Sequence, residues 1–342
     1  MSKVKSFLEK QQIHPSFKTY GIDALGAMAY GLFASLLIGT ILNTIGQETG
    51  WTFLTDEVWP AVQMAVGPAI AVAIAYKLKA TDLVLFSMTV VGYASYQLGG
   101  PVGVFLATIV ATELGKLVSK TTKLDILITP SITILSGLFI AKLVGPGVQA
   151  LMTSLGEFIT FATAQQPFIM GILVSVTMGV ALTLPISSAA ISMMLGLSGL
   201  AAGAATVGCC ANMVGFAVIS YRDNGLGGLA AQGLGTSMLQ MPNIMRNPRI
   251  WLPAIISSAI LGPFSTIVFK MENTPYGAGM GTSGLVGQIG TLEAMRGQTQ
   301  TLPLIGTILL LQIILPAVLS YIVYGIMRKQ GWIKDGQMLL EH

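Results

Sequence analysis

The sequence predicts an all-α membrane protein in which about ten elements enter the bilayer, including re-entrant hairpins formed by glycine-rich segments. The chain is 53% hydrophobic and only 9% charged, with a mean hydropathy of +0.75. Because soluble domains carry about 25% charged residues, this composition indicates an integral membrane protein. Long apolar runs recur along the whole chain, and two of the intervals between them are unusually rich in glycine.

The apolar runs give the expected order of the helices. A membrane-spanning helix needs roughly 20 apolar residues, or fewer where the protein shields its ends. We expect spans at residues 21–45, 60–76, 83–98, 102–117, 126–144, 167–184, 200–221, 250–268 and 302–326. The mildly amphipathic segment 148–161 is expected to lie along the membrane surface. The apolar segment 186–197 is too short to cross alone.

The distribution of charge predicts that both termini are cytoplasmic, because short loops rich in Lys and Arg stay on that side. The interval containing Glu48, Asp56 and Glu57 has no basic residue, which suits the external side. Both termini on one side require an even number of crossings. We therefore expect 225–241 to cross and 277–295 to enter and leave from outside. The residues placed inside are Lys3, Lys5, Lys10, Lys18, Lys77, Lys79, Lys116, Lys120, Lys123, Arg246, Arg249, Arg328, Lys329 and Lys334.

The same pattern divides the chain into three parts. Residues 1–20 form a cytoplasmic segment without the apolar core of a signal peptide. Residues 21–327 form the membrane domain, with a scaffold half to about residue 165 and a substrate half after it. Residues 328–342 form a cytoplasmic tail, whose last three residues, Leu340, Glu341 and His342, resemble the remnant of an expression tag.

The two glycine-rich segments share a pattern. Residues 225–240 read GLGGLAAQGLGTSMLQ, and residues 276–295 read YGAGMGTSGLVGQIGTLEAM. Gly-x-Gly-Thr-Ser occurs at 233–237 and again at 279–283. Broken backbone is tolerated at membrane depth only where protein buries it or where it lines a wet cavity, and paired glycine-interrupted segments mark substrate sites. We therefore expect the two segments to approach each other near the bilayer midplane.

Uncharged polar side chains gather in the last third of the chain. Amides and hydroxyls donate and accept hydrogen bonds without a charged partner, so they suit a neutral polyhydroxylated ligand. The alternative is close helix packing, as expected for Gly199-Leu-Ala-Ala-Gly203. Asn243 and Thr291 belong to the same polar group. The predicted substrate-binding residues are Asn212, Gln232, Thr236, Ser237, Asn273, Gly281, Thr282, Ser283, Gln288 and Glu293.

Few ionisable residues fall near the spans, and each is a candidate because charge inside a membrane is costly. Asp23 and Lys142 lie at predicted span ends, where they reach water. Glu113 and Lys116 have the spacing of a helical ion pair. Glu293 is either a ligand-binding or proton-coupled carboxylate, or the partner of Arg296.

Several classes of site are excluded. The chain has no P-loop, and the Gly-x-Gly-x-x-Gly at 279–284 lacks the preceding strand of a dinucleotide fold. His14 and His342, the only histidines, lie outside the spans, so no intramembrane site can use histidine. Adjacent Cys209 and Cys210 have no metal-ligand spacing and are expected to pack as small hydrophobes. We therefore expect no catalytic residue, metal, cofactor or nucleic-acid partner.

Three segments resemble a known family. They are LTLPISSAAISMMLG at 182–196, MPNIMRNPRIWLP at 241–253 and GMGTSGLVGQIGT at 279–291. They are similar to the EIIC-like membrane proteins of the bacterial phosphotransferase system, in the branch named for the perfringolysin O regulator. The resemblance implies a homodimeric, multi-pass inner-membrane protein that moves a sugar by alternating access, while a separate EIIB protein phosphorylates it.

The chain departs from the sugar carriers of that family in one respect. Their membrane site uses a histidine and a glutamate, whereas no histidine is available here and Glu293 is the only glutamate beside a glycine segment. The leading hypothesis is a transporter of a small polar solute, by resemblance a sugar. The alternatives are a membrane sensor that regulates gene expression through a partner without transport, and a carrier of another metabolite or ion.

Overall fold

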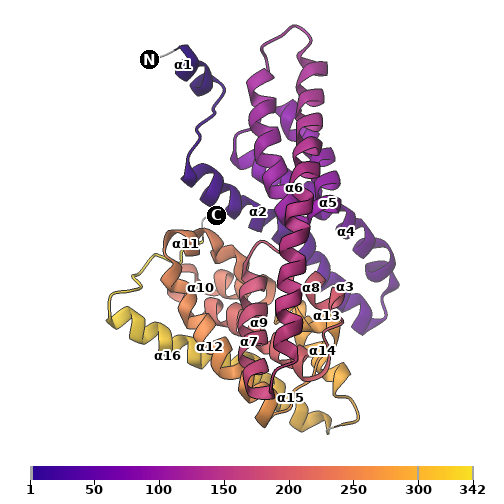
Figure 1. Cartoon of the computed structure of the whole chain (residues 1–342), viewed down its shortest axis with the longest axis vertical. Coiled ribbons are helices and arrows are strands. Elements are labelled where there is room, and N and C mark those ends of the chain that lie inside the picture. Colours follow the sequence, from indigo (N-terminus) through magenta and orange to yellow (C-terminus); the bar gives the residue numbers. More distant parts are fainter. Residues whose placement is uncertain (1–2, 299, 341–342) are drawn as a thin grey trace. The chain divides into compact units, whose positions relative to one another are not determined.

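The computed structural model describes residues 3–298 and 300–340, and within them every named element is helical. An isolated antiparallel bridge between Gly199 and Asn273 is the β-type pairing found among these residues. Seven helices of this described part are long and apolar enough to cross a membrane, which confirms a polytopic all-α protein (Figure 1). The chain forms two compact units, Met1–Leu151 and Met152–His342.

The first unit begins with short helices that π-helical turns join into longer ones. Lys18–Gln47 and Phe53–Lys77 are therefore continuous apolar helices, as the runs at 21–45 and 60–76 predicted. The helical bounds are α1 (Lys3–Lys10), α2 (Ala24–Leu32), α3 (Ile38–Thr49), α4 (Trp59–Lys77), α5 (Asp82–Val118) and the first part of α6 (Asp125–Thr163).

Helix α5 is a hairpin of two antiparallel arms. Gly99 and Gly100 leave the helical conformation, and Gly100 has a φ of +55°. The ends of the hairpin meet at its base, where Thr81 Oγ1 and Ser119 Oγ lie 2.8 Å apart. The structure thus confirms two separate helical runs at 83–98 and 102–117.

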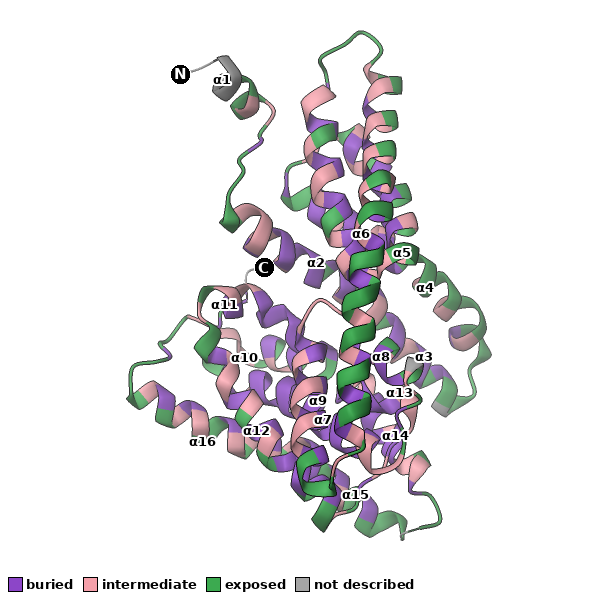
Figure 2. Ribbon diagram, viewed as in Figure 1, coloured by how far each residue is buried: buried purple, intermediate pink, exposed green. Residues whose placement is uncertain are grey.

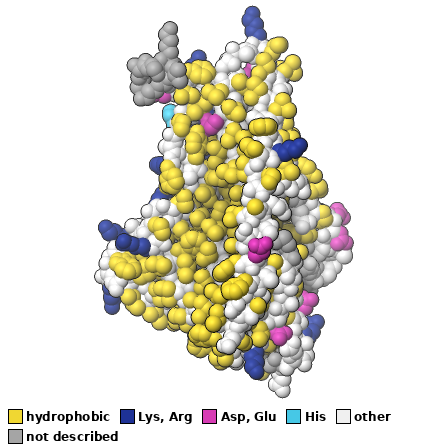
Figure 3. All heavy atoms as spheres, viewed as in Figure 1, with side chains coloured by type: hydrophobic (Ala, Val, Ile, Leu, Met, Phe, Trp, Pro, Cys, Tyr) yellow, Lys and Arg dark blue, Asp and Glu magenta, His cyan; other side chains and the backbone are white. Residues whose placement is uncertain are grey.

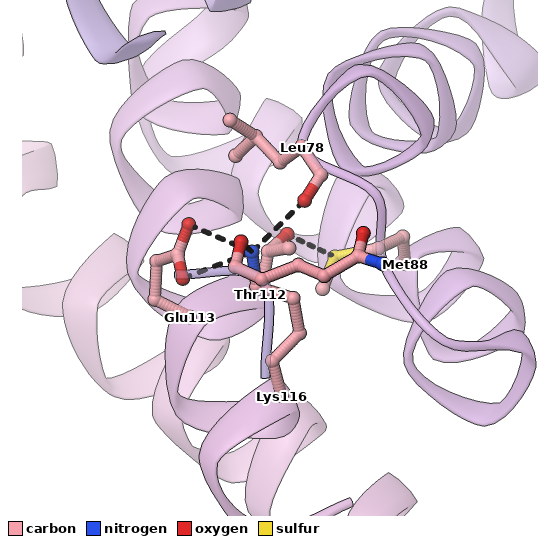
Figure 4. Close-up of polar contacts among 6 residues, drawn as sticks. Leu78, Met88, Thr112, Glu113 and Lys116 are labelled. Carbon is pink, nitrogen blue, oxygen red and sulfur yellow. Dashed lines mark hydrogen bonds and ion pairs between the residues drawn. The ribbon is translucent and has the colours of Figure 1, made fainter. Parts of the chain in front are cut away.

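A buried lysine ties this hairpin to two other chain segments (Figure 4). Lys116 is only 1% exposed, and its Nζ donates to Leu78 O at 2.9 Å, Gln12 O at 3.0 Å and Glu113 Oε1 at 3.1 Å. The predicted ion pair with Glu113 is confirmed. Lys116 is not the loop residue expected from the charge pattern, because it lies inside α5. All three ammonium hydrogens are used, so the buried charge is both paired and hydrogen-bonded.

Helix α6 differs from the prediction of a span followed by a surface segment. It runs without interruption from Asp125 to Thr163 and carries Pro146 in its interior, so 148–161 is not a separate element. An internal proline can kink a helix without ending it, and ending it at membrane depth would leave backbone groups unpaired. Only a minority of the residues of α6 are buried (Figure 2), and the apolar side chains of Leu135 and Phe139 are exposed.

The second unit is built around one buried helix. Helix α9 packs against α7, α12 and α16, and most of its residues are buried, including Cys209 and Cys210 as predicted. The bounds are α7 (Pro167–Thr183), α8 (Ser188–Met194), α9 (Gly199–Ile219), α10 (Tyr221–Ala230), α11 (Met241–Arg246), α12 (Leu252–Pro263), α13 (Pro275–Ala278), α14 (Val286–Ala294), α15 (Thr301–Leu309) and α16 (Leu315–Lys329). Apolar side chains cover much of the molecular face in Figure 3, where charged ones are sparse.

The expected crossing at 225–241 is wrong, because the chain doubles back there. Gly225 breaks α10 with a φ of +60°. The two arms lie side by side, since Gln240 Nε2 donates to Gln232 Oε1 at 2.9 Å. Asn224 and Gln240 both donate to the carbonyl of Met338, so the segment returns to where it began. We call residues 221–246 the first glycine hairpin.

The C-terminal tail packs on this hairpin. The Asp223 carboxylate accepts the N–H groups of Gly336 and Met338, each at 3.1 Å. The Leu340 N–H donates to Asn224 Oδ1 at 2.8 Å, and Leu340 is buried. Leu340 is therefore part of the fold, whereas residues 341–342 of the predicted tag remnant lie outside the described residues.

Close approach of helices in the second unit depends on glycines of α9. A Cβ on Gly203 would collide with the carbonyl of Met271, and one on Gly208 would collide with that of Ser175. Gly203 thus has the packing role expected for its motif. Gly199 has a φ of +59° and forms the bridge to Asn273.

Gly208→Ala is expected to lower the free energy of unfolding by about 1–3 kcal/mol, because overpacking forces α9 and α7 apart. Gly325→Ala in α16 is the matched control, since no atom lies within 4 Å of its added Cβ. The control should be neutral or stabilising by up to about 1 kcal/mol. Thermal unfolding of both purified variants in detergent measures the difference, and equal stability would contradict the packing argument.

Candidate functional site

The second glycine segment forms a hairpin of α13, a turn at 279–285 and α14. The turn contains Gly281 and Gly284, with φ values of +55° and +53°, and Leu285, which is also left-handed at +60°. The N–H of Gly287 returns to the carbonyl of Gly281 at 3.0 Å. The helix is therefore broken at the repeated motif, as the sequence predicted. We call residues 275–294 the second glycine hairpin.

The tip of this hairpin lies directly on α9. A Cβ on Gly281 would stand 2.8 Å from Cys209 Cβ and 3.0 Å from Cys210 N. Glycine is thus required at position 281 for two reasons, the left-handed backbone and the missing side chain.

Helix α8 supports the broken backbone from another direction. Ser188 Oγ donates to the carbonyl of Gly279 at 2.6 Å, and Ser192 Oγ donates to that of Pro275 at 2.7 Å. Both serines are buried. The apolar segment 186–197, too short to cross, therefore braces the second glycine hairpin. Two hydroxyls spaced i, i+4 on one helical face were the available signal for this role.

The two hairpins meet through their glycine motifs. The π-helical turn Ala231–Gly235 of the first contacts the 3-10 turn Ser283–Leu285 of the second. The predicted approach of the two motifs is confirmed, whereas its position relative to the bilayer stays a prediction.

Asn212 belongs to the framework around this meeting point. Its Nδ2 donates to Gly208 O at 3.1 Å and to Ser258 Oγ at 3.2 Å. Its Oδ1 accepts from Thr183 Oγ1 at 3.2 Å and from Trp251 Nε1 at 2.9 Å. All four of its hydrogen-bonding positions are filled, so Asn212 has no capacity left for a ligand in this conformation.

Asn273 also commits its side-chain N–H groups within the protein. Three acceptors lie within hydrogen-bond distance of its Nδ2, namely Thr206 Oγ1 at 2.6 Å, Gly287 O at 2.9 Å and Thr291 Oγ1 at 3.2 Å, and they share its two hydrogens. Its Oδ1 accepts the N–H of Thr274 at 2.7 Å. Asn273 therefore joins α9 to the α14 arm of the second glycine hairpin and also bonds Thr274, the residue that precedes α13.

The predicted residues of the first hairpin also bond internally. Gln232 Nε2 donates to Ser220 Oγ and Gly228 O, and its Oε1 accepts from Gln240. Thr236 Oγ1 accepts the N–H of Met238 at 3.1 Å, and Ser237 Oγ lies 2.7 Å from Thr183 Oγ1. Asn243 donates to Gln240 Oε1 and to Leu339 O.

Thr282, Ser283 and Gln288 differ from all of these. Ser283 Oγ and Gln288 Oε1 are buried and have no hydrogen-bond partner among the described residues. The polar contacts that Thr282 Oγ1 and Gln288 Nε2 make are to sulfur, Met213 Sδ and Cys210 Sγ respectively, each at 3.5 Å. Sulfur is a weak acceptor, so these three residues keep hydrogen-bonding capacity at the tip.

Glu293 is not brought to this tip. It lies seven residues after Val286, at the far end of α14, and its side chain is exposed. A helix rises 1.5 Å per residue, which places Glu293 roughly 10 Å along the axis from the start of α14.

Sequence reasoning missed Gln312. This residue is fully buried in the π-helical turn Leu310–Ile314, where its Nε2 donates to Thr291 Oγ1 at 2.9 Å. Its Oε1 has no hydrogen-bond partner in the part of the chain that the structure describes. It extends the polar chain that begins at Asn273. A lone amide within the long apolar run 302–326 was the available signal, and π-helical turns often mark functional positions.

The comparisons with known proteins agree with this architecture. The family model described as "Phosphotransferase system, EIIC" matches residues 22–340, which covers both glycine hairpins and the docked tail. The comparisons with curated proteins and with solved structures give no significant match. The matched range includes nearly the whole chain, and the chain therefore belongs to the phosphotransferase-system EIIC family.

Proposed function

We propose that the protein carries a small neutral polar solute, in keeping with its family a sugar, and binds it at the tips of the two glycine hairpins. The observation that supports this proposal most strongly is the pair of unpartnered buried atoms, Ser283 Oγ and Gln288 Oε1, beside Thr282. An unpaired buried polar group costs about 1–3 kcal/mol. A sugar hydroxyl both donates and accepts, so it can satisfy both atoms.

The absence of charge in the proposed contacts favours a neutral ligand. The side chains offered at the tip are two hydroxyls and one amide, and the carboxylate of Glu293 is exposed at the other end of α14. An uncompensated anionic or cationic ligand would meet a large desolvation penalty in such surroundings.

Asn212 and Asn273 have a different role in this proposal. Their hydrogen bonds hold α7, α9, α12 and the second hairpin in register. A binding constellation must be held in place by side chains that are themselves locked. In alternating access, we propose that this framework keeps the hairpin tips together as one rigid site.

We propose that the protein works as a homodimer in the bacterial inner membrane. Phosphorylation of the sugar is assigned to a separate EIIB-type protein, and this chain acts as the permease component without catalysis. Family membership supports each of these proposals. Both termini are proposed to be cytoplasmic on the basis of the charge pattern.

Thr282→Val, Ser283→Ala and Gln288→Leu are each expected to weaken solute binding by about 1–2 kcal/mol, because each removes one hydrogen bond to the ligand. Ser257→Ala in α12 is the matched control, since it removes another buried hydroxyl without a partner among the described residues. A thermal-shift screen of sugars and sugar phosphates identifies the ligand, and calorimetry then measures affinity. Equal effects of Ser283→Ala and Ser257→Ala would refute a binding role for the tip.

Uptake of that ligand into proteoliposomes tests transport separately from binding. Wild-type protein is expected to show saturable uptake that the three tip variants reduce and Ser257→Ala preserves. Binding without flux would instead identify a membrane sensor.

Cysteine labelling tests the orientation. Single substitutions His14→Cys and Lys334→Cys, at exposed positions, are expected to react with a membrane-impermeant maleimide only after the cells are opened. Glu57→Cys, also exposed, should react in intact cells. The natural Cys209 and Cys210 are buried, so they give little background. Reaction of either terminal position in intact cells would overturn the charge argument.

A further inference from the structure

A large basic hollow lies at the base of the α5 hairpin in the first unit. Its volume is about 1160 Å³, and four of the eleven residues that line it are lysines, whereas none is acidic. The lysines are Lys10, Lys77, Lys79 and Lys120. This hollow is separate from the glycine hairpins and has no part in the proposed solute site.

Hydrogen bonds of Lys116 and Gln11 hold together the chain segments that form this hollow. Lys116 Nζ bonds the carbonyl of Leu78, which stands between Lys77 and Lys79, and the carbonyl of Gln12. Gln11 Nε2 donates to the carbonyl of Ser119 at 3.2 Å, directly beside Lys120. The three chain segments that carry the four lysines are therefore fastened together by the hydrogen bonds of two side chains.

The lysines of the lining meet opposing partial charges from helix ends and one nearby carboxylate. Helices α1, α4 and α5 all end here, followed by the left-handed residues Gln12, Lys79 and Lys120. Three helix C-termini contribute about −1.5 charge. Asp125, whose carboxylate accepts the N–H of Lys120, adds one negative charge. These charges offset part of the four lysines, and Lys116 is already neutralised by Glu113.

We propose that this hollow binds a phosphate group. Lysine binds phosphate as a compact point charge, and hydroxyls and amides such as those of Thr81, Thr121 and Gln11 supply further donors in the lining. Exposed Phe7 and Tyr76 line the same hollow and offer apolar contact for the rest of the ligand. The phosphate belongs either to an anionic phospholipid headgroup or to a soluble phosphorylated metabolite.

The general preference of cytoplasmic loops for lysine accounts for basic residues here, but not for their convergence on one hollow. Lys123 and Lys142 provide the comparison, because they are exposed lysines of the same unit and do not line it. If the hollow is a binding site, removing the charges of Lys79 and Lys120 must reduce the affinity for the phosphate ligand more than removing those of Lys123 and Lys142.

The experiment titrates purified full-length protein with phosphatidylglycerol, with phosphatidylcholine and with glycerol 3-phosphate, and follows bound ligand by native mass spectrometry. The double variant Lys79→Gln/Lys120→Gln is expected to weaken binding of the phosphate ligand by roughly tenfold or more. Lys123→Gln/Lys142→Gln should change it less than about twofold. Circular dichroism checks folding, and Lys10→Gln/Lys77→Gln replaces the first variant if that one misfolds.

The results distinguish the two sources of the phosphate group and can also overturn the proposal. Selective loss of phosphatidylglycerol binding identifies a lipid headgroup site, and selective loss of glycerol 3-phosphate binding identifies a soluble ligand. Equal losses of affinity in the hollow and control variants would show that the lysines act only as general surface charge, which would overturn the proposal. It is also overturned if wild-type protein binds phosphatidylcholine as well as phosphatidylglycerol and does not bind glycerol 3-phosphate.

Discussion

A helix break at membrane depth leaves backbone groups that the protein itself, or water in a cavity, must bond, because the hydrocarbon offers them no partner. Asn273 illustrates the solution in the second unit, where one amide joins Thr206 of α9 to the α14 arm of a glycine hairpin and to Thr274 at the start of the other arm. Ser188 and Ser192 repair two carbonyls of the same hairpin. The broken backbone keeps a defined conformation because these buried side chains are themselves fixed and hydrogen-bond to it.

The need for hydrogen-bond partners also distinguishes residues that hold the framework from residues that are candidates for ligand binding. Asn212 uses all of its hydrogen-bonding positions within the protein, whereas Ser283 Oγ and Gln288 Oε1 use none. Removing a saturated amide would leave several partners unpaired, and removing a tip hydroxyl would leave the fold intact. Incomplete pairing is therefore the observation on which the proposed binding role of the tip rests.

The two units stabilise their buried polar groups in different ways. The first unit uses charge, since the Lys116 ammonium is paired with Glu113 and also bonds two backbone carbonyls. The second relies on neutral amides and hydroxyls at its centre. Neutral groups suit a site that must release its ligand, because they avoid the large desolvation changes of an ionic contact.

The sequence by itself determined the membrane class, the helical runs, the paired glycine breaks and the Glu113–Lys116 ion pair, because each depends on composition or on spacing along one helix. Only the tertiary structure showed that 225–241 doubles back, that α6 continues through Pro146 and that Leu340 is buried. It also divided the polar residues into saturated Asn212 and unsaturated Ser283, and it brought Gln312 to Thr291. These features depend on partners far apart in the chain, and hydrophobic periodicity carries no information about which distant carbonyl a given amide will meet.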